Sequence, residues 1–362
     1  MNEKEDQNLH KQSDPSKSNW SFCPICGNEL PNIQDLRFCI KCGTNLKYIK
    51  DHKRLPSESP YKVSKYTPKY QPTYITYKRS KIADKDLINI KEHKIWGPGI
   101  SIGLTMASYF MMNLIVVAIS FIVIFISFDL NATYNLISNS YFTALISLVE
   151  LVFLLFPLIF AGKYLENPTL KNRFILLGFT TRGYNKKGIV REIFIGLGFA
   201  VAGVIMVNGI SILLEIIIEF AFGTQIVRDT GGLETDIIPQ DIGSLILFCI
   251  VMIVVIGTSE EILFRGFLQK GLVRKVGNKW GILITALIFT MIHLIGVFTV
   301  AILSPLLAVI YFLLSFFPYF AISLLLGWLY HWRKENLLAV MITHGVYDVL
   351  TVLIAYFLFT FF

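Results

Sequence analysis

The feature that most constrains this chain is a series of long apolar segments that begins near residue 100. Each runs for roughly 18 residues or more, the length that an α-helix needs to cross the hydrocarbon core of a bilayer. Hydrophobic residues make up 54% of the 362 positions and charged residues only 16%, which excludes an ordinary soluble domain. We therefore predict an all-α polytopic membrane protein with about seven transmembrane helices. Pro305 and Pro318 leave open an eighth, because they could divide the stretch from Leu294 to Tyr319. The candidate spans are residues 101–127, 141–162, 189–222, 243–266, 280–298, 304–331 and 336–360.

The charges in the links between these spans predict how the chain lies in the membrane. Lys and Arg are frequent before the first span and in the links at 163–191 and 267–279. The link at 128–140 has none, and the link at 223–242 has a single one. Because cytoplasmic loops carry the excess of Lys and Arg, this alternation predicts a protein of the cell membrane with a cytoplasmic N-terminus and an extracytoplasmic C-terminus. The net charge of +8 then reflects topology and contact with membrane lipid, and no nucleic-acid partner is expected.

Four of the five cysteines lie close together near the N-terminus, in two Cys-x-x-Cys-Gly motifs. Such motifs can present four thiolates tetrahedrally to one ion, and the glycine after each pair permits a tight turn. A module of roughly 25 residues buries too little apolar surface to fold alone, so metal binding must supply the folding energy. The clustering favours metal over a disulfide pair, and hence a reducing compartment. We predict a structural zinc ribbon over residues 21–47, similar to those at the N-terminus of many prokaryotic membrane proteins. Its ligands would be Cys23, Cys26, Cys39 and Cys42.

Two polar segments flank the predicted ribbon. Residues 1–20 contain no apolar core, so we expect them to be disordered and not a signal peptide. Residues 48–95 are rich in Lys, Tyr, Pro and Ser, which indicates a flexible basic linker. The alternative is a strip held on anionic lipid headgroups. The transmembrane domain would then occupy residues 96–362.

Polar residues within the apolar segments form three pairs with one spacing. Glu260 to Gly266 reads Glu-Glu-Ile-Leu-Phe-Arg-Gly at the end of an apolar segment, where charged groups by default mark function. Glu261 and Arg265 are four residues apart, so they share a helix face and can form an ion pair. The alternative for Arg265 is an anchor at the lipid headgroups. The other pairs are Phe289 with His293 and His344 with Asp348.

The predicted topology brings these groups to a similar depth. His344 lies about eight residues into the last span and Asp348 about twelve, which at about 1.5 Å per residue is roughly 12–18 Å below the cytosolic surface. His293 lies about thirteen residues into its own span, at a similar depth. Glu260 approaches this level on a helix that runs towards the cytosol. A site at this depth can admit water from the cytosol and an apolar substrate from the lipid.

Carboxylates and imidazoles together suggest hydrolysis. A carboxylate beside a neutral imidazole can hold and deprotonate a water, and a second imidazole can stabilise the oxyanion that forms. No cysteine or Ser-His-Asp arrangement stands out as a nucleophile, so we favour direct attack by an activated water. The alternative is a catalytic zinc ion bound by Glu260, His293 and His344, with the water on the metal.

The order Glu-Glu-x-x-x-Arg, Phe-x-x-x-His and His-x-x-x-Asp on three helices resembles the CPBP family. These are the CAAX-prenyl-endopeptidase and bacteriocin-processing intramembrane proteases, also called the Abi family. The resemblance covers about residues 240–355 and includes Gly327-Trp328-Leu329-Tyr330. It implies an intramembrane endopeptidase whose substrate is a membrane-associated peptide or protein.

The resemblance also implies roles for individual residues. Glu260 and His293 match the pair that activates water, and His344 and Asp348 match the residues that stabilise the oxyanion or complete a metal site. Glu261 and Arg265 match the remaining positions, and we assign them an orienting ion pair. The family commonly has Asn at the last position. Asp348 departs from that pattern, and its negative charge suits a metal or a shared proton better than an oxyanion.

Two other functions compete with proteolysis. A non-catalytic membrane adaptor, or a bacteriocin-immunity protein, would use the zinc ribbon to bind a cytosolic protein partner. A transporter with a Glu and His proton relay would show internal repeats, and none is evident in the sequence. Glu150, Glu215 and Glu219 match none of the motifs, and we expect Glu150 to form an ion pair or line a cavity.

Overall fold

The computed structural model describes residues 21–23, 29–30, 36–39, 45–52, 95–223, 239–297, 302 and 304–361. The chain divides into two compact units, Met1–Lys69 and Tyr70–Phe362. Each unit is described by itself.

The N-terminal unit contains two short antiparallel bridges, and the second lies sixteen residues after the first. The bridged pairs are Phe22 with Glu29 and Phe38 with Asn45. The residue after each phenylalanine is a cysteine, and both Cys23 and Cys39 are buried in one apolar cluster with Leu30 and Leu46. Two stretches with the same local structure therefore contribute equivalent cysteines to a shared interior.

Several predictions for this part of the chain fall outside the described residues. They concern Cys26, Cys42, residues 1–20 and most of the basic linker. The helix α1 (Leu46–His52) continues past residue 47, where the ribbon was predicted to end.

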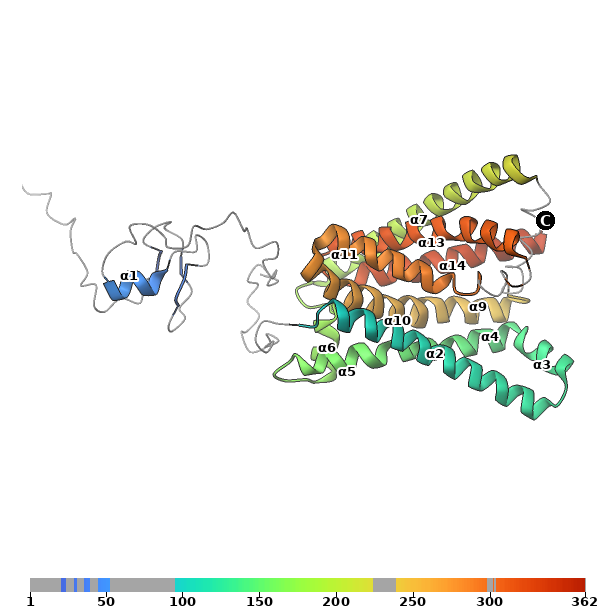
Figure 1. Cartoon of the computed structure of the whole chain (residues 1–362), viewed down its shortest axis with the longest axis horizontal. Coiled ribbons are helices and arrows are strands. Elements are labelled where there is room, and N and C mark those ends of the chain that lie inside the picture. The colour runs from blue at the N-terminus through green and yellow to red at the C-terminus, as the bar shows by residue number, and fades with distance from the viewer. Residues whose placement is uncertain are drawn as a thin grey trace, which may run out of the picture. The chain divides into compact units, whose positions relative to one another are not determined.

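The larger unit consists of helices and turns throughout its described residues, as predicted (Figure 1). Among the described residues, six helical segments are long and apolar enough to cross a membrane. Its elements are α2 (Pro98–Ser127), α3 (Leu130–Ile137), α4 (Ser140–Ile146), the 3-10 helix η3 (Ser147–Leu154), α5 (Leu155–Lys163), α6 (Leu170–Leu176), α7 (Lys186–Phe222), α9 (Ile242–Val251), the π-helices η5 (Met252–Ile256) and η6 (Ile262–Gln269) on either side of α10 (Gly257–Glu261), α11 (Lys270–His293), α13 (Pro305–Trp332) and α14 (Leu338–Phe361).

The longest helix, Ile242–His293, includes two of the predicted spans. A straight helix of its 52 residues would extend about 78 Å at 1.5 Å per residue, which is more than twice the thickness of a hydrocarbon core. Gly277 interrupts it with a φ of 81° and a ψ of 168°, a conformation that glycine adopts without strain. Beyond this break the chain packs back on itself, because a Cβ atom added at Gly281 would lie 2.9 Å from Cα of Val273.

Proline does not divide the helix that follows. Pro305 is the first residue of α13, a position where its missing N–H costs nothing. Pro318 lies inside α13 without ending it. An eighth span created by a break at Pro318 is therefore absent from Pro305–Trp332.

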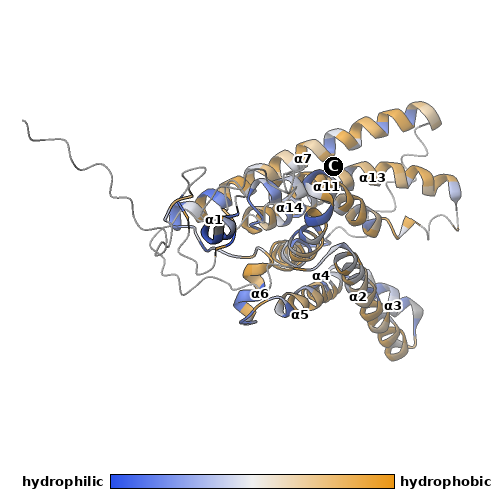
Figure 2. Ribbon diagram, turned by 60° about the vertical axis from the view of Figure 1, so that its left-hand side comes forward, coloured by the Kyte–Doolittle hydropathy of each residue, from blue (hydrophilic) through white to orange (hydrophobic). Residues whose placement is uncertain are grey.

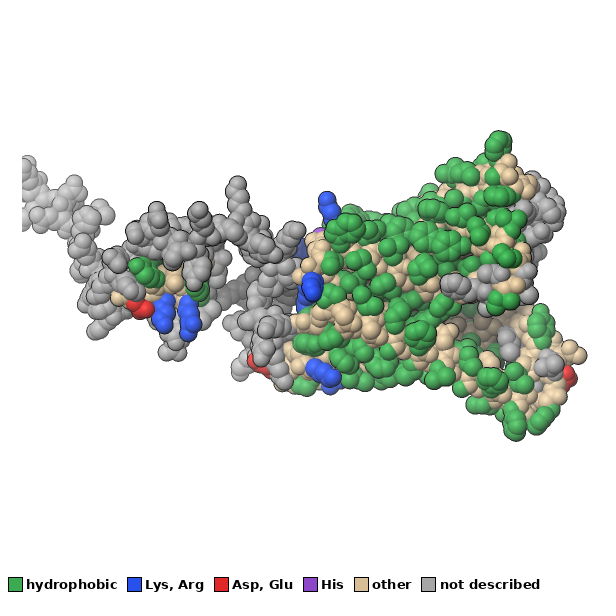
Figure 3. All heavy atoms as spheres, in the orientation of Figure 1, with side chains coloured by type: hydrophobic (Ala, Val, Ile, Leu, Met, Phe, Trp, Pro, Cys, Tyr) green, Lys and Arg blue, Asp and Glu red, His purple; other side chains and the backbone are tan. Residues whose placement is uncertain are grey.

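Two groups of helices enclose the segment from α9 to η6 (Figure 1). On one side α7, α13 and α14 pack against one another, and α14 also contacts η5 and α10. On the other side lie α2, α4 and η3. The long helices are mostly apolar along their length (Figure 2), and hydrophobic side chains cover most of the visible face of this unit (Figure 3). Such a surface is expected of a protein whose solvent is lipid, and it agrees with the predicted multi-pass membrane protein.

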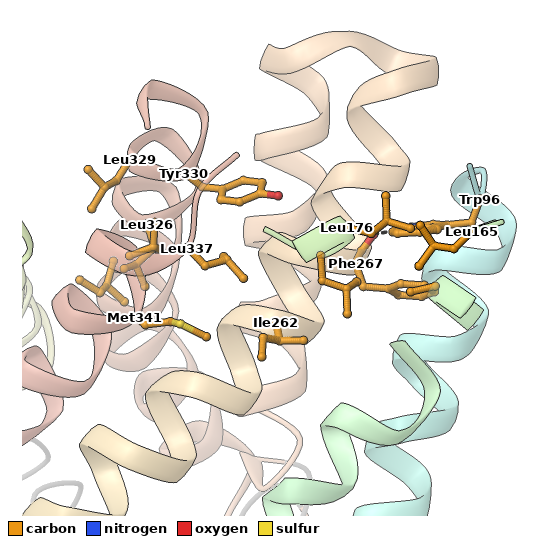
Figure 4. Packing of buried hydrophobic residues seen from close by; sticks show 14 of the residues in the cluster. Trp96, Leu165, Leu176, Ile262, Phe267, Leu326, Leu329, Tyr330, Leu337 and Met341 are labelled. Carbon is orange, nitrogen blue, oxygen red and sulfur yellow. Dashed lines mark hydrogen bonds between the residues drawn. The ribbon is translucent and has the colours of Figure 1, made fainter. Parts of the chain in front are cut away.

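A buried apolar cluster fixes η6 from both sides (Figure 4). Ile262 faces Met341 of α14. Phe267 stacks on Trp96 with ring centroids 4.7 Å apart. The Trp96 indole N–H also donates to the Phe267 carbonyl oxygen at 2.8 Å, which anchors the start of α2 to η6.

Polar contacts at one end of the bundle hold the turn before α14. The Lys270 ammonium donates to the Leu176 carbonyl at 2.7 Å and lies 3.2 Å from the Glu335 carboxylate. Arg333 forms an ion pair with the buried Glu192 of α7. The hydrogen bond from Arg333 to Glu192 raises the pKa of that guanidinium above its usual value. These contacts fix where α14 begins and thus which of its residues face α10.

Candidate active site

Two adjacent acids occupy a helix segment with altered geometry. Glu260 and Glu261 end the short helix α10, which lies between the π-helices η5 and η6. Such π-helical segments are rare and are frequently found at functional sites. Both side chains are buried although they point about 100° apart, because α10 has neighbours on opposite sides in η3 and α14.

Glu261 connects Arg265 with His344. Its Oε1 atom accepts a hydrogen bond from Nη1 of Arg265 at 2.6 Å and another from Nδ1 of His344 at 2.6 Å. Arg265 is 0% exposed, donates to the Ser323 hydroxyl at 2.9 Å and lies over the Phe289 ring. The predicted ion pair of Glu261 and Arg265 is confirmed. The alternative of a headgroup anchor is wrong, because the guanidinium does not reach the surface.

Glu260 lies between two imidazoles. Its Oε1 atom is 3.7 Å from Nε2 of His293, and its Oε2 atom is 3.7 Å from Nε2 of His344. Oε2 is buried and has no hydrogen-bond partner within the described parts of the chain. Separations of this size are too long for a direct hydrogen bond.

Hydrogen bonds orient both imidazoles so that Nε2 faces Glu260. The Phe289 carbonyl only accepts, so Nδ1 of His293 donates to it at 2.8 Å. Nδ1 of His344 is engaged in the same way by the Glu261 carboxylate. In the neutral form of either histidine, the lone pair on Nε2 therefore points towards Glu260.

Asp348 and Phe289 complete the walls of the site. Oδ2 of Asp348 is 3.5 Å from Nε2 of His344, one helical turn away. The Phe289 ring stacks on His293 with centroids 4.2 Å apart. The side chains of His293 and Asp348 are 25% and 20% exposed, against 6% for Glu260. His293 and Asp348 are thus more exposed than Glu260, which is buried between the helices.

Close helix contact sets the spacing between Glu261 and His344. A Cβ atom added at Gly345 would lie 2.7 Å from Cα of Ile253, and one added at Gly257 would lie 2.8 Å from the Gly345 nitrogen. Only glycine lets the backbones of α14 and of the helix that carries the acids approach so closely.

All six predicted site residues meet at this place, with three side chains from α10 and η6, one from α11 and two from α14. The comparison with protein families bears on the same segment. Residues 242–350 match the family model described as type II CAAX prenyl endopeptidase Rce1-like. No curated protein and no solved structure matches the chain.

The Rce1-like match supports the resemblance to the CPBP family. It extends over 109 residues of the 362 and includes all three motifs. The matched model describes a protease family, so it supports a hydrolase in the membrane-embedded part of the chain. The N-terminal unit lies outside the match.

The structure brings two further residues to the site. Ser323 binds Arg265, and nothing in its apolar surroundings marks it in the sequence. Glu150, to which the sequence assigned no catalytic role, has Glu260, Asp348 and His344 as its charged neighbours. An acid inside a candidate span was the only sequence signal for Glu150.

The arrangement at Glu260 bears on the alternative of a catalytic metal. Within the described ranges, no three His, Cys, Asp or Glu side chains are grouped as metal ligands. The Glu260 carboxylate turns one oxygen to each of the two imidazoles. The alternative of a catalytic zinc ion bound by Glu260, His293 and His344 stays a prediction.

Proposed function

We propose that this protein is an intramembrane endopeptidase that hydrolyses a peptide bond with a water activated by Glu260 and His293. The observation that carries the proposal is the position of the Glu260 carboxylate, 3.7 Å from the Nε2 atoms of two oriented imidazoles. The Rce1-like match of the same segment supports this reaction class.

Water activation follows from the hydrogen-bonding capacities of the groups. A water between Glu260 and His293 donates one proton to the carboxylate and the other to the Nε2 lone pair. As its oxygen attacks the carbonyl carbon of the substrate, the proton on the Glu260 side transfers to the carboxylate. Glu260 then returns this proton to the leaving amine. Phe289 keeps His293 in place through its carbonyl oxygen and its ring.

His344 is proposed to stabilise the oxyanion. Its Nδ1–H is held by Glu261, which Arg265 holds in turn. In the imidazolium form, which the carboxylates of Glu261 and Asp348 favour, His344 also donates from Nε2 to the developing oxyanion. Asp348 then supports the charge on His344, a different role from that of an Asn in the same position.

The substrate class is proposed from the description of the matched family. That description names CAAX prenyl endopeptidases, which act near a lipidated C-terminus. A site in the apolar interior of a bundle with a lipid-facing surface suits a peptide that is itself anchored in the membrane.

Reconstitution of the full chain tests the proposed function. The probe is a fluorescence-quenched peptide that ends in a farnesylated Cys-aliphatic-aliphatic-X sequence, with the unprenylated peptide for comparison. We expect the parent to cleave the farnesylated probe, and Glu260→Gln and His293→Ala to lower kcat by about 10²-fold or more. Glu215→Gln, at an exposed site on α7, is the matched control. Equal cleavage by Glu260→Gln and the parent would overturn the proposal.

We further propose that the N-terminal unit is a zinc ribbon in the cytoplasm. The sixteen-residue repeat of bridge and buried cysteine supports a shared site for Cys23 and Cys39 with Cys26 and Cys42. When bound, zinc would hold the two bridged stretches together.

The proposed orientation has a separate test. Lys and Arg gather at one end of the larger unit, which supports a cytoplasmic position for that end (Figure 3). In a Cys249→Ser background, an impermeant thiol reagent added outside intact cells should label Ser138→Cys and not Lys275→Cys. The opposite labelling would reverse the orientation.

A further inference from the structure

Glu150 is a partly buried acid that belongs to none of the three motifs. It lies on η3, which packs against η5, α10 and η6, the segments before, at and after the two motif glutamates. Its charged neighbours are Glu260, Asp348 and His344. Glu150 thus approaches the site from a helix that the motifs do not include.

Buried carboxylate oxygens in this region lack hydrogen-bond partners among the described residues. Oε2 of Glu150 and Oε2 of Glu260 are both buried, and neither has a hydrogen-bond partner among the residues that the structure describes. Oε2 of Glu261 is also buried and without a partner among these residues, but Oε1 of Glu261 accepts two hydrogen bonds. Asp348 faces His344 at 3.5 Å.

Charge balance decides how Glu150 and Glu260 can coexist. Two neighbouring carboxylates packed among apolar helices repel each other, and burial disfavours the charged form of each. Glu260 faces an imidazole on each side, which stabilises its anion. Among the residues that the structure describes, the charged groups that act on Glu150 are Glu260, Asp348 and His344, and none is Lys or Arg. The proton of the pair therefore belongs to Glu150.

We propose that Glu150 is a positioning residue that stays uncharged and donates a hydrogen bond from its carboxylic acid to the Glu260 carboxylate, directly or through one water. This donor would hold Oε2 of Glu260 so that Oε1 remains available to the attacking water beside His293. The inference rests on the proposed function, since it gives Glu260 the role of base.

Two substitutions of Glu150 separate positioning from simple packing. Glu150→Gln keeps the shape and an N–H donor, so kcat should stay within about threefold of the parent. Glu150→Leu keeps much of the bulk and removes the donor, so kcat should fall by about 10- to 100-fold with KM nearly unchanged. Glu215→Leu, exposed on α7, is the control for loss of an acid elsewhere in the unit. Parental kcat in Glu150→Leu, or an equal loss in Glu150→Gln, would overturn the inference.

Infrared spectroscopy gives a readout that needs no substrate. The difference spectrum between the parent and Glu150→Gln should contain the carbonyl band of a protonated carboxylic acid. Loss of carboxylate bands instead would show Glu150 to be ionised and would overturn the inference. This measurement is independent of cleavage, so failure of the proposed function, seen as an active Glu260→Gln, is distinguishable from failure of the role of Glu150.

Discussion

At the scale of single residues, Glu261 is the most constrained side chain of the site. One of its oxygens accepts hydrogen bonds from both Arg265 and His344. Because the pair with Arg265 is fully buried, the carboxylate compensates a charge that has no contact with solvent. Stability and the orientation of His344 therefore depend on the same group.

Removal of that carboxylate should destabilise the fold. Glu261→Ala leaves the Arg265 guanidinium buried without its anion, so we expect a loss of about 3–5 kcal/mol in the free energy of unfolding. Thermal unfolding in detergent measures the effect, with Glu215→Ala as the exposed control. An unchanged melting temperature would mean that Arg265 finds another partner.

Asp348 offers a test of the oxyanion site. Asp348→Asn keeps the size of the side chain and supplies an N–H donor next to His344, so kcat should remain within about tenfold of the parent. Asp348→Ala removes both the charge and any donor, and kcat should fall by about 10²-fold. If Asn were as damaging as Ala, the charge itself would be required, as for a metal ligand.

At the scale of elements, glycine contacts between helices set the geometry. α14 touches the helix of the two acids through Gly345 and Gly257, and it touches α7 through Gly196, whose added Cβ atom would meet the Ala339 carbonyl at 2.9 Å. The neighbours at these contacts are partly backbone, which cannot rotate away. These contacts have no room for even one added methyl group, and they therefore fix the distance between the helices at the site.

An added methyl group at this contact should reduce activity more than stability. Gly345→Ala would push α14 away from Ile253 and displace His344 from Glu260, and a displacement of about 1 Å can cost about 10²-fold in rate. Gly209→Ala on α7, with nothing within 4 Å of the added atom, is the matched control and should keep parental activity. The measurement is kcat on the farnesylated probe, with melting temperature alongside. Equal rates in the two variants would show that the helices adjust.

At the scale of the whole molecule, the two units have separate sources of stability. The larger one has an extensive apolar core around η6, whereas the described residues of the smaller one include a cluster of four buried side chains, two of them cysteines. We predict that metal binding supplies the folding energy of the smaller unit.

Chelation should therefore affect one unit and not the other. A strong zinc chelator, or Cys23→Ser with Cys39→Ser, should release zinc and make residues 21–52 sensitive to protease while cleavage of the probe continues. Zinc content, limited proteolysis and kcat are measured on the same samples of the full chain, with Cys249→Ser as the control. If the chelator stopped cleavage in a sample whose ribbon still holds its zinc, a metal would be placed at the site of Glu260.

Several elements were predictable because the membrane imposes a length on apolar segments. The span predicted at 189–222 is α7 (Lys186–Phe222), and the one at 336–360 is α14 (Leu338–Phe361). Contacts between helices were less predictable. The continuation of helix through Lys270 to the break at Gly277, and the passage of α13 through Pro318, depend on neighbouring helices that sequence periodicity does not reveal.

By itself the sequence determined the all-α membrane-spanning class, the pair of Glu261 and Arg265, and the set of acids and imidazoles, because residue type and a four-residue spacing suffice for these. Only the tertiary structure decided that His344 binds Glu261, that Glu260 lies between two imidazoles, and that Glu150 joins them. The physical reason is that helical spacing fixes neighbours along one helix, whereas the partners across helices depend on how closely glycine contacts let those helices approach.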